Sequence, residues 1–105
     1  ESLATILQFQ DYRVLARSNS GQVWTDIDQF DPDLLLLDVW LEPVDGDVIS
    51  RQLKTSSNRK KIPIILISAT DNLQELALRC QADDYLKKPF DLSELLKKID
   101  YYLSS

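Results

Sequence analysis

The most constraining feature of this chain is a run of four leucines, residues 34–37, that ends at Asp38. An apolar run this short predicts a strand buried on both faces, as in parallel sheets. Because Asp38 ends the run, we expect its carboxylate at the C-terminal end of the strand, where open α/β sheets bind ligands. The alternative interpretation is that Asp38 only forms a turn at the strand end.

Other short segments have strand character. Ile62 to Ser68 is a second strand that we expect to be buried on both faces, with Pro63 at its start, where a missing N–H is tolerated. Tyr12–Ala16 is rich in strand-forming residues, and Tyr85–Leu86 is a very short strand. Asp83 and Asp84 precede it, and we expect them to face solvent or to cap the preceding helix.

Apolar residues at helical spacing predict helices between these strands. The expected helices span Ser2 to Phe9 and Val23 to Phe30, follow Gly46, run from Leu73 to Cys80, and begin at Asp91 or Ser93. Ser56 to Lys61 is a polar loop. The alternation of strands and helices predicts one α/β domain with a parallel sheet covered on both faces.

Composition excludes several classes of function. A net charge of −5 argues against nucleic acid as a direct partner. No apolar run is long enough to span a membrane and no secretory leader is visible, so we expect a cytoplasmic protein. The chain has no histidine, which excludes Ser-His and Cys-His catalytic pairs. Cys80, the single cysteine, is expected to pack in the core.

Three strand ends carry polar side chains: Asp38, Ser68 and Lys88. In a parallel sheet these ends meet at one edge. A carboxylate there can attack phosphorus and form an aspartyl phosphate. The Lys88 ammonium and the Ser68 hydroxyl would stabilise the new charge, and a divalent cation, normally Mg²⁺, would complete its neutralisation.

Three motifs resemble the receiver domain of bacterial two-component response regulators. They are Asp38-Val39-Trp40-Leu41…Asp45-Gly46, Ile67-Ser68-Ala69, and the stretch from Ala82 to Phe90. The resemblance identifies residues 1–105 as one receiver domain. It implies a three-layer, doubly wound, flavodoxin-like fold with five parallel strands in the order 2-1-3-4-5.

The resemblance also implies roles for individual residues. Asp38 would be the phosphoacceptor, Ser68 would contact the phosphoryl group, and Lys88 would pair with it. Ser68 and Tyr85 would form the conformational switch, and Lys88–Pro89 would be a cis bond. Asp38 and the backbone carbonyl of Trp40 would be ligands of Mg²⁺.

The chain departs from the receiver pattern in several ways. The first strand, with its two adjacent acids, is missing, so we expect an N-terminally truncated receiver in which Mg²⁺ binding is weak or absent. Tyr12–Ala16 and Leu34–Asp38 would then face a gap. Glu42 stands where the family usually has proline. Gln81 stands where it often has glycine, so the turn after the fourth helix must close without the residue best suited to positive φ.

The function implied is phosphorylation of Asp38 by a histidine kinase or phosphotransfer protein. The expected output is an altered surface on the fourth helix, fifth strand and last helix, which would contact an output domain, a downstream protein or a second copy. We do not expect an enzyme. One alternative is a receiver-like interaction module that is not phosphorylated. Another is a haloacid dehalogenase-type phosphohydrolase, although Trp40 stands where such enzymes carry a second aspartate.

Overall fold

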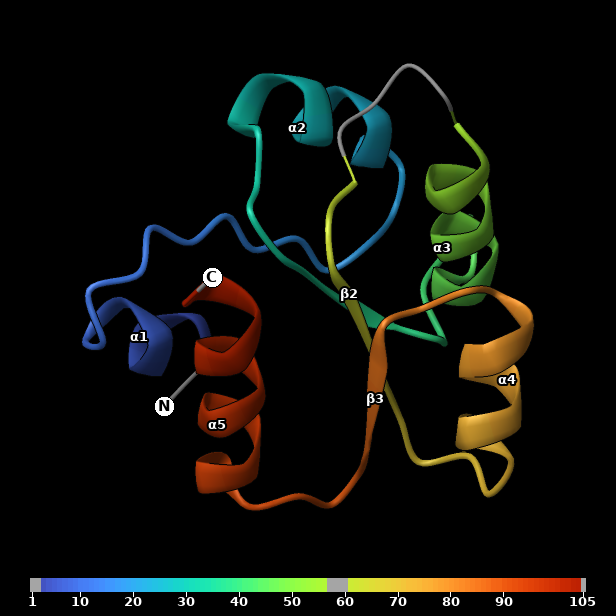
Figure 1. Ribbon diagram of the computed structural model, residues 1–105. Coiled ribbons are helices and arrows are strands. Elements are labelled where there is room, and N and C mark those ends of the chain that lie inside the picture. Colours follow the sequence, from blue (N-terminus) through green and yellow to red (C-terminus); the bar gives the residue numbers. More distant parts are fainter. Residues whose placement is uncertain (1–2, 57–60, 105) are drawn as a thin grey trace.

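The two long apolar runs form adjacent parallel strands in the computed structural model, which describes residues 3–56 and 61–104. A third parallel strand completes the described sheet, in the order β1-β2-β3 (Figure 1). The elements in chain order are α1 (Leu3–Gln8), α2 (Val23–Phe30), β1 (Leu35–Asp38), α3 (Gly46–Thr55), β2 (Ile64–Ser68), α4 (Leu73–Arg79), β3 (Asp84–Lys87) and α5 (Leu92–Leu103). The prediction of an α/β domain with a parallel sheet is confirmed.

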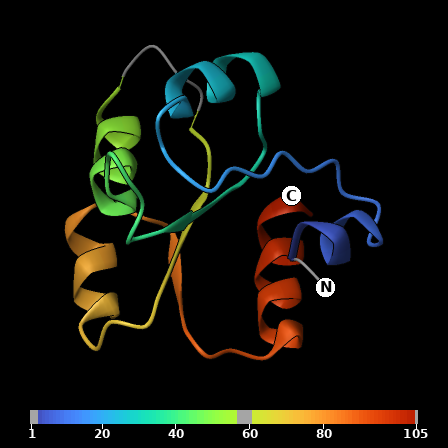
Figure 2. The same cartoon turned by 180° about the vertical axis from the view of Figure 1, so that it is seen from behind.

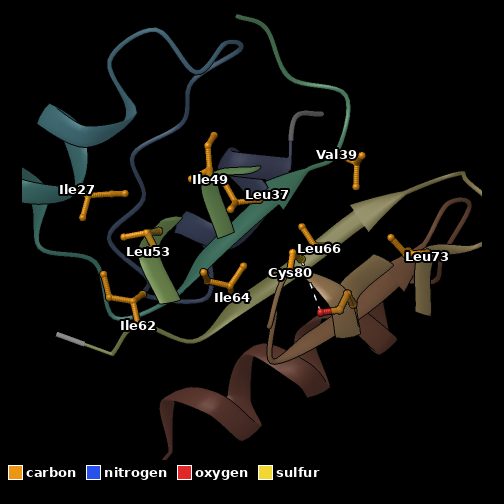
Figure 3. Close-up of a cluster of buried hydrophobic side chains, with 11 residues drawn as sticks. Ile27, Leu37, Val39, Ile49, Leu53, Ile62, Ile64, Leu66, Leu73 and Cys80 are labelled. Atoms are coloured by element: carbon orange, nitrogen blue, oxygen red, sulfur yellow. Dashed lines mark hydrogen bonds between the residues drawn. The ribbon is translucent and has the colours of Figure 1, made fainter. Parts of the chain in front are cut away.

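Helices cover both faces of this sheet, α3 and α4 on one side and α1 and α5 on the other (Figures 1 and 2). Alternate side chains of β2 supply the two cores. Ile64 and Leu66 belong to the cluster with α2, α3 and α4, while Ile65 and Ile67 belong to the cluster with α1 and α5. Figure 3 shows the first cluster, in which Cys80 lies buried as expected.

Only one of the two long strands is buried as the sequence predicts. All five residues of β2 are buried, because the strand has a neighbour on each edge and helices on each face. In β1, Leu35 and Leu36 are only half-buried. The expectation of a fully buried leucine strand is wrong, since β1 pairs with β2 alone in the described sheet.

The prediction of a strand at Tyr12–Ala16 is also wrong. Residues 12–17 have no regular secondary structure, because no neighbouring strand in the described sheet pairs with them. Two arginines hold this segment on α2 instead. Arg13 Nη2 donates to the Phe30 carbonyl at 3.3 Å, and its guanidinium lies 4.6 Å from the centre of the Phe30 ring. Arg17 donates two hydrogen bonds to the Asp26 carboxylate, at 3.0 and 3.2 Å.

A groove of about 590 Å³ lies between this segment and β1. Tyr12 and Val14 line one side, Leu35 and Leu37 line the other, and Leu7 and Ile99 also contribute. The gap expected beside the leucine strand is therefore present. The three described strands match the third, fourth and fifth strands of the implied order 2-1-3-4-5.

The helices agree with the predictions to within a few residues at their ends. Asp91 precedes α5, and its N–H donates to Glu94 Oε1 at 3.5 Å. Gln81 adopts φ 62°, so the turn after α4 closes in the left-handed region without glycine, as the sequence requires. The loop expected at Ser56–Lys61 lies largely outside the described residues. No helix within the described ranges is both long and apolar enough to cross a membrane.

Candidate functional site

The parallel register brings the three predicted strand ends to one edge of the sheet. Asp38 is level with Ile67 on β2, and Ser68 is level with Lys87 on β3. The Lys88 N–H donates to the Ser68 carbonyl at 2.9 Å, which continues this alignment one residue past β3. The peptide bond from Lys88 to Pro89 is cis, as the resemblance implies.

Asp38 and Lys88 are in direct contact. Lys88 Nζ donates to Asp38 Oδ2 at 2.7 Å, and the Trp40 N–H donates to Asp38 Oδ1 at 3.0 Å. Their side chains are 34% and 47% exposed for Asp38 and Lys88 respectively. The carboxylate is thus held by hydrogen bonds to both oxygens and is still accessible to a reagent in solution.

The contacts of Asp38 affect its ionisation. Partial burial raises the pKa of Asp38, but the Lys88 hydrogen bond, the Trp40 N–H and the Lys88 charge together outweigh burial. The pKa of Asp38 therefore lies below its ordinary value, because the charged form has the better partners. Asp38 is a carboxylate, the form that can act as a nucleophile, throughout the neutral range.

Ser68 lies at the same edge of the sheet, but its hydroxyl is hydrogen-bonded to the β2–α4 loop. Its side chain is 1% exposed, and its Oγ accepts a hydrogen bond from the Thr70 N–H at 3.3 Å. Thr70 Oγ1 in turn donates to Asn72 Oδ1 at 2.8 Å. The structure thus places Ser68 at the sheet edge, with its hydroxyl bonded to the start of the β2–α4 loop.

Gly46 closes the loop that follows β1. Its N–H donates to the Val39 carbonyl at 3.0 Å. A side chain at this position would collide with the backbone of Asp38, so only glycine permits so close an approach. Asp45 has an extended backbone immediately before α3, and Gly46 is the first residue of that helix.

Tyr85 and Trp40 have different environments. Tyr85 lies on β3, half-buried, and packs against the cluster under α3 and α4. The Trp40 side chain is 70% exposed. Its backbone, rather than its indole ring, makes the observed contact with Asp38.

Asp83, just before β3, is exposed as expected, whereas Asp84, the first residue of β3, is half-buried, and both carboxylates are ion-paired. Asp83 Oδ2 accepts from Lys54 Nζ at 2.5 Å and from the Ile64 N–H at 2.8 Å. Asp84 accepts from Lys98 Nζ at 2.9 Å and from the Tyr102 hydroxyl at 3.2 Å. These carboxylates therefore fasten α3 and α5 to the sheet, a role that depends on partners far away in the sequence.

The described donors do not make a complete Mg²⁺ site. Within residues 3–56 and 61–104 there is no group of three or more histidine, cysteine, aspartate or glutamate side chains that could hold a metal ion. Asp38 and the Trp40 carbonyl would supply one carboxylate and one neutral oxygen. Mg²⁺ commonly needs one or two carboxylates together with phosphate oxygens and water.

A partly exposed carboxylate–lysine pair at the C-terminal edge of a parallel sheet is the feature that the chain shares with one class of protein. Residues 1–100 match the response regulator receiver domain, and the chain belongs to this family. It is a receiver domain of the two-component response regulator class. It is 37% identical over 101 residues to response regulator MprA of Mycobacterium leprae. The aligned region covers 94% of this chain and 43% of MprA.

Other relatives agree. Response regulator protein GraR of Staphylococcus aureus is 32% identical over 101 residues, covering 94% of this chain and 44% of that protein. The chain thus spans less than half the length of these curated relatives.

Solved structures show the same fold. The BeF₃-activated N-terminal receiver domain of Klebsiella pneumoniae RstA superposes with a TM-score of 0.87 at 28% identity, covering 98% of this chain and 87% of that one. The receiver domain of sensor histidine kinase PA1611 from Pseudomonas aeruginosa has a TM-score of 0.82 at 27% identity, covering 96% and 84% of the two chains. That structure has a magnesium ion coordinated in its active-site cleft.

Proposed function

We propose that Asp38 accepts a phosphoryl group from the phosphohistidine of a histidine kinase or phosphotransfer protein. The observation that carries this proposal is the Asp38 carboxylate, bonded to Lys88 on one oxygen and to the Trp40 N–H on the other. A carboxylate oxygen attacks phosphorus and forms the O–P bond. The N–P bond of the donor breaks, and the imidazole nitrogen keeps the electron pair.

Lys88 has a charge-neutralising role in this reaction. Negative charge moves from the carboxylate to the phosphoryl oxygens as the acyl phosphate forms. The Lys88 ammonium, whose side chain is 47% exposed, can pair with a phosphoryl oxygen as that charge forms. The chain acts as the acceptor of a group supplied by its partner, and needs no catalytic histidine of its own.

The phosphoryl group then acts on the surface of α4, β3 and α5. The Ser68 hydroxyl leaves the Thr70 N–H and donates to a phosphoryl oxygen, which releases the start of the β2–α4 loop. Space vacated near Ser68 admits the ring of Tyr85. An output domain, a downstream protein or a second copy of the chain recognises the altered surface.

Mg²⁺ would be held by Asp38 and the Trp40 carbonyl, together with the phosphoryl group. In this part of the chain these two ligands alone bind the ion weakly, since Mg²⁺ prefers further carboxylates. The ion would lower the negative charge that the incoming phosphoryl group meets.

The first prediction is that acetyl phosphate adds one phosphoryl group to the full-length protein and that Asp38→Asn abolishes the addition. Asparagine keeps the shape of the side chain but is not a nucleophile at neutral pH. Intact-mass spectrometry measures the added mass. Asp45→Asn is the matched control, because Asp45 is an exposed acid on the same loop. Equal labelling of the Asp38→Asn variant would contradict the assignment of Asp38 as the phosphoacceptor.

A further inference from the structure

A buried serine outside the predicted site is bonded to the loop that follows Asp38. Ser20 lies between the 12–17 segment and α2 and is 4% exposed. Its N–H donates to the Glu42 carbonyl at 2.8 Å. Its Oγ donates to the Val44 carbonyl at 2.7 Å and accepts from the Val44 N–H at 2.8 Å. One residue therefore makes three short hydrogen bonds to a single loop.

These bonds complete the support of the β1–α3 loop, residues 39–45. The base of the loop is closed by the bond from the Gly46 N–H to the Val39 carbonyl. The far part contains the exposed residues Glu42, Pro43 and Asp45, while Leu41 and Val44 are partly buried against the core. The hydrogen bonds from Ser20 to Glu42 and Val44 fix this part of the loop to the segment before α2. Trp40 lies between the two supports and donates its N–H to Asp38 Oδ1.

We propose that Ser20 is a positioning residue for phosphoryl transfer: it fixes the β1–α3 loop so that the backbone of Trp40 is aligned with the carboxylate of Asp38. This inference rests on the proposed function. The Trp40 N–H orients one carboxylate oxygen while Lys88 holds the other, so a shift of the loop misaligns the attacking group. Small misplacements of reacting groups lower rates strongly.

The side-chain chemistry of Ser20 is specific to this role. A hydroxyl can donate and accept at the same time, and here it satisfies both the N–H and the carbonyl of Val44. Alanine can do neither and would leave both Val44 groups without this partner. Threonine keeps the hydroxyl. The turn chemistry of Ser18-Asn19-Ser20-Gly21 gives no sign of this contact, because its partner lies 24 residues away.

The test compares Ser20→Ala, Ser20→Thr and Ser50→Ala in the full-length protein. Ser50 is the matched control, since it is 0% exposed and donates to the Cys80 carbonyl at 3.1 Å, on the α4 side of α3. Both alanine variants lose a buried hydroxyl, but only one loses a support of the Asp38 loop. The rate of acetyl phosphate labelling is measured across donor concentrations, at temperatures where each variant is fully folded.

We expect Ser20→Ala to lower the maximal labelling rate roughly tenfold, with Ser20→Thr within about threefold of the parent and Ser50→Ala unchanged. Equal slowing by Ser50→Ala would overturn the proposal, as would parental labelling of Ser20→Ala. If Ser20→Ala does not fold, Ser20→Cys takes its place, because its thiol is only a weak donor.

Hydrogen exchange separates this inference from the proposed function. In the protein without phosphoryl donor, Ser20→Ala should speed exchange of the Trp40 amide at least roughly tenfold relative to Ser50→Ala, since the loop opens more often. If the parent protein accepts no phosphoryl group, the proposed function fails. The exchange rate of the Trp40 amide still shows whether Ser20 fixes the β1–α3 loop. Unchanged Trp40 exchange would overturn the positioning role.

Discussion

The chemistry of the site depends on two adjacent lysines with different environments. Lys88 Nζ is 2.7 Å from Asp38 Oδ2, whereas Lys87 Nζ is 2.8 Å from Asp71 Oδ1. The Asp71 side chain is 98% exposed, so that second pair lies in solvent and contributes little to stability. Lys87, the last residue of β3, therefore belongs to the surface, and Lys88, one residue further on, belongs to the site.

Lys88→Gln should raise the pKa of Asp38, because it removes both the charge and the charge-assisted hydrogen bond that lower it. The folded-state pKa lies below the unfolded value, so the stability from ionised Asp38 is present above about 3.8 and is lost as pH falls through the folded pKa. Lys88→Gln should remove that acid-dependent part of stability.

Carboxyl-carbon NMR across the acid range measures the pKa directly, and urea unfolding at several pH values measures its linkage to stability. Lys87→Gln is the control and should leave the pKa of Asp38 unchanged. An unaltered Asp38 titration in Lys88→Gln would show that Lys88 is not its main partner in solution.

At the scale of elements, the sequence predicted well where local pattern and tertiary context agree. β2 is apolar up to Ser68, has a neighbour on each edge and is buried along its length, as predicted. Tyr12–Ala16 has equal strand character but lacks a paired neighbour in the described sheet. Strand propensity cannot replace a hydrogen-bonding partner, so the local pattern failed there.

Part of the site could also be predicted, because there too the local pattern agrees with the tertiary context. Asp38 and Ser68 are the last residues of their strands and Lys88 directly follows β3, so the parallel topology alone brings them to one edge. The Ser20 contact and the fastening roles of Asp83 and Asp84 depend on loops and helices meeting across long sequence separations. No local pattern carries that information.

The turn after α4 stores backbone strain that can be removed. Gln81 has φ 62°, a conformation that costs a residue with a Cβ atom but not glycine. Gln81→Gly should therefore stabilise the domain by roughly 1 kcal/mol. Lys97→Gly, an exposed position inside α5, is the contrasting change and should destabilise by roughly 1 kcal/mol. Urea unfolding compares the two, and loss of stability in Gln81→Gly would show that the side chain makes a compensating contact.

The switch is predicted to be a shift between two states of the β2–α4 region rather than a new fold. Beryllofluoride, a phosphoryl mimic, should change NMR shifts across α4 and β3 in the full-length protein. Ser68→Ala should reduce these changes, because alanine has no hydroxyl to donate to a phosphoryl oxygen. Binding of the mimic that leaves α4 and β3 untouched would contradict the role of Ser68 and Tyr85.

In the described part of the chain, the β1 edge of the sheet lies beside a groove of about 590 Å³. In the described sheet β1 pairs on one side only, and half-buried leucines line the other side. Exposed strand edges with apolar side chains favour pairing with another chain. The stability of the domain therefore depends on what occupies this groove.

We expect residues 1–105 as a separate polypeptide to associate or to unfold with low cooperativity, and to bind Mg²⁺ weakly. Light scattering and urea unfolding measure the first two properties, and calorimetric titration measures the third. A stable, cooperative monomer that binds Mg²⁺ tightly would refute this expectation.

Phosphorylation of Asp38 is the central claim, and locating the phosphoryl group tests it most directly. Borohydride reduces an aspartyl phosphate to homoserine, which marks the acceptor permanently. After treatment of the full-length protein with acetyl phosphate and borohydride, peptide mass spectrometry should find homoserine at position 38. Homoserine at another aspartate, or at none, would contradict the assignment.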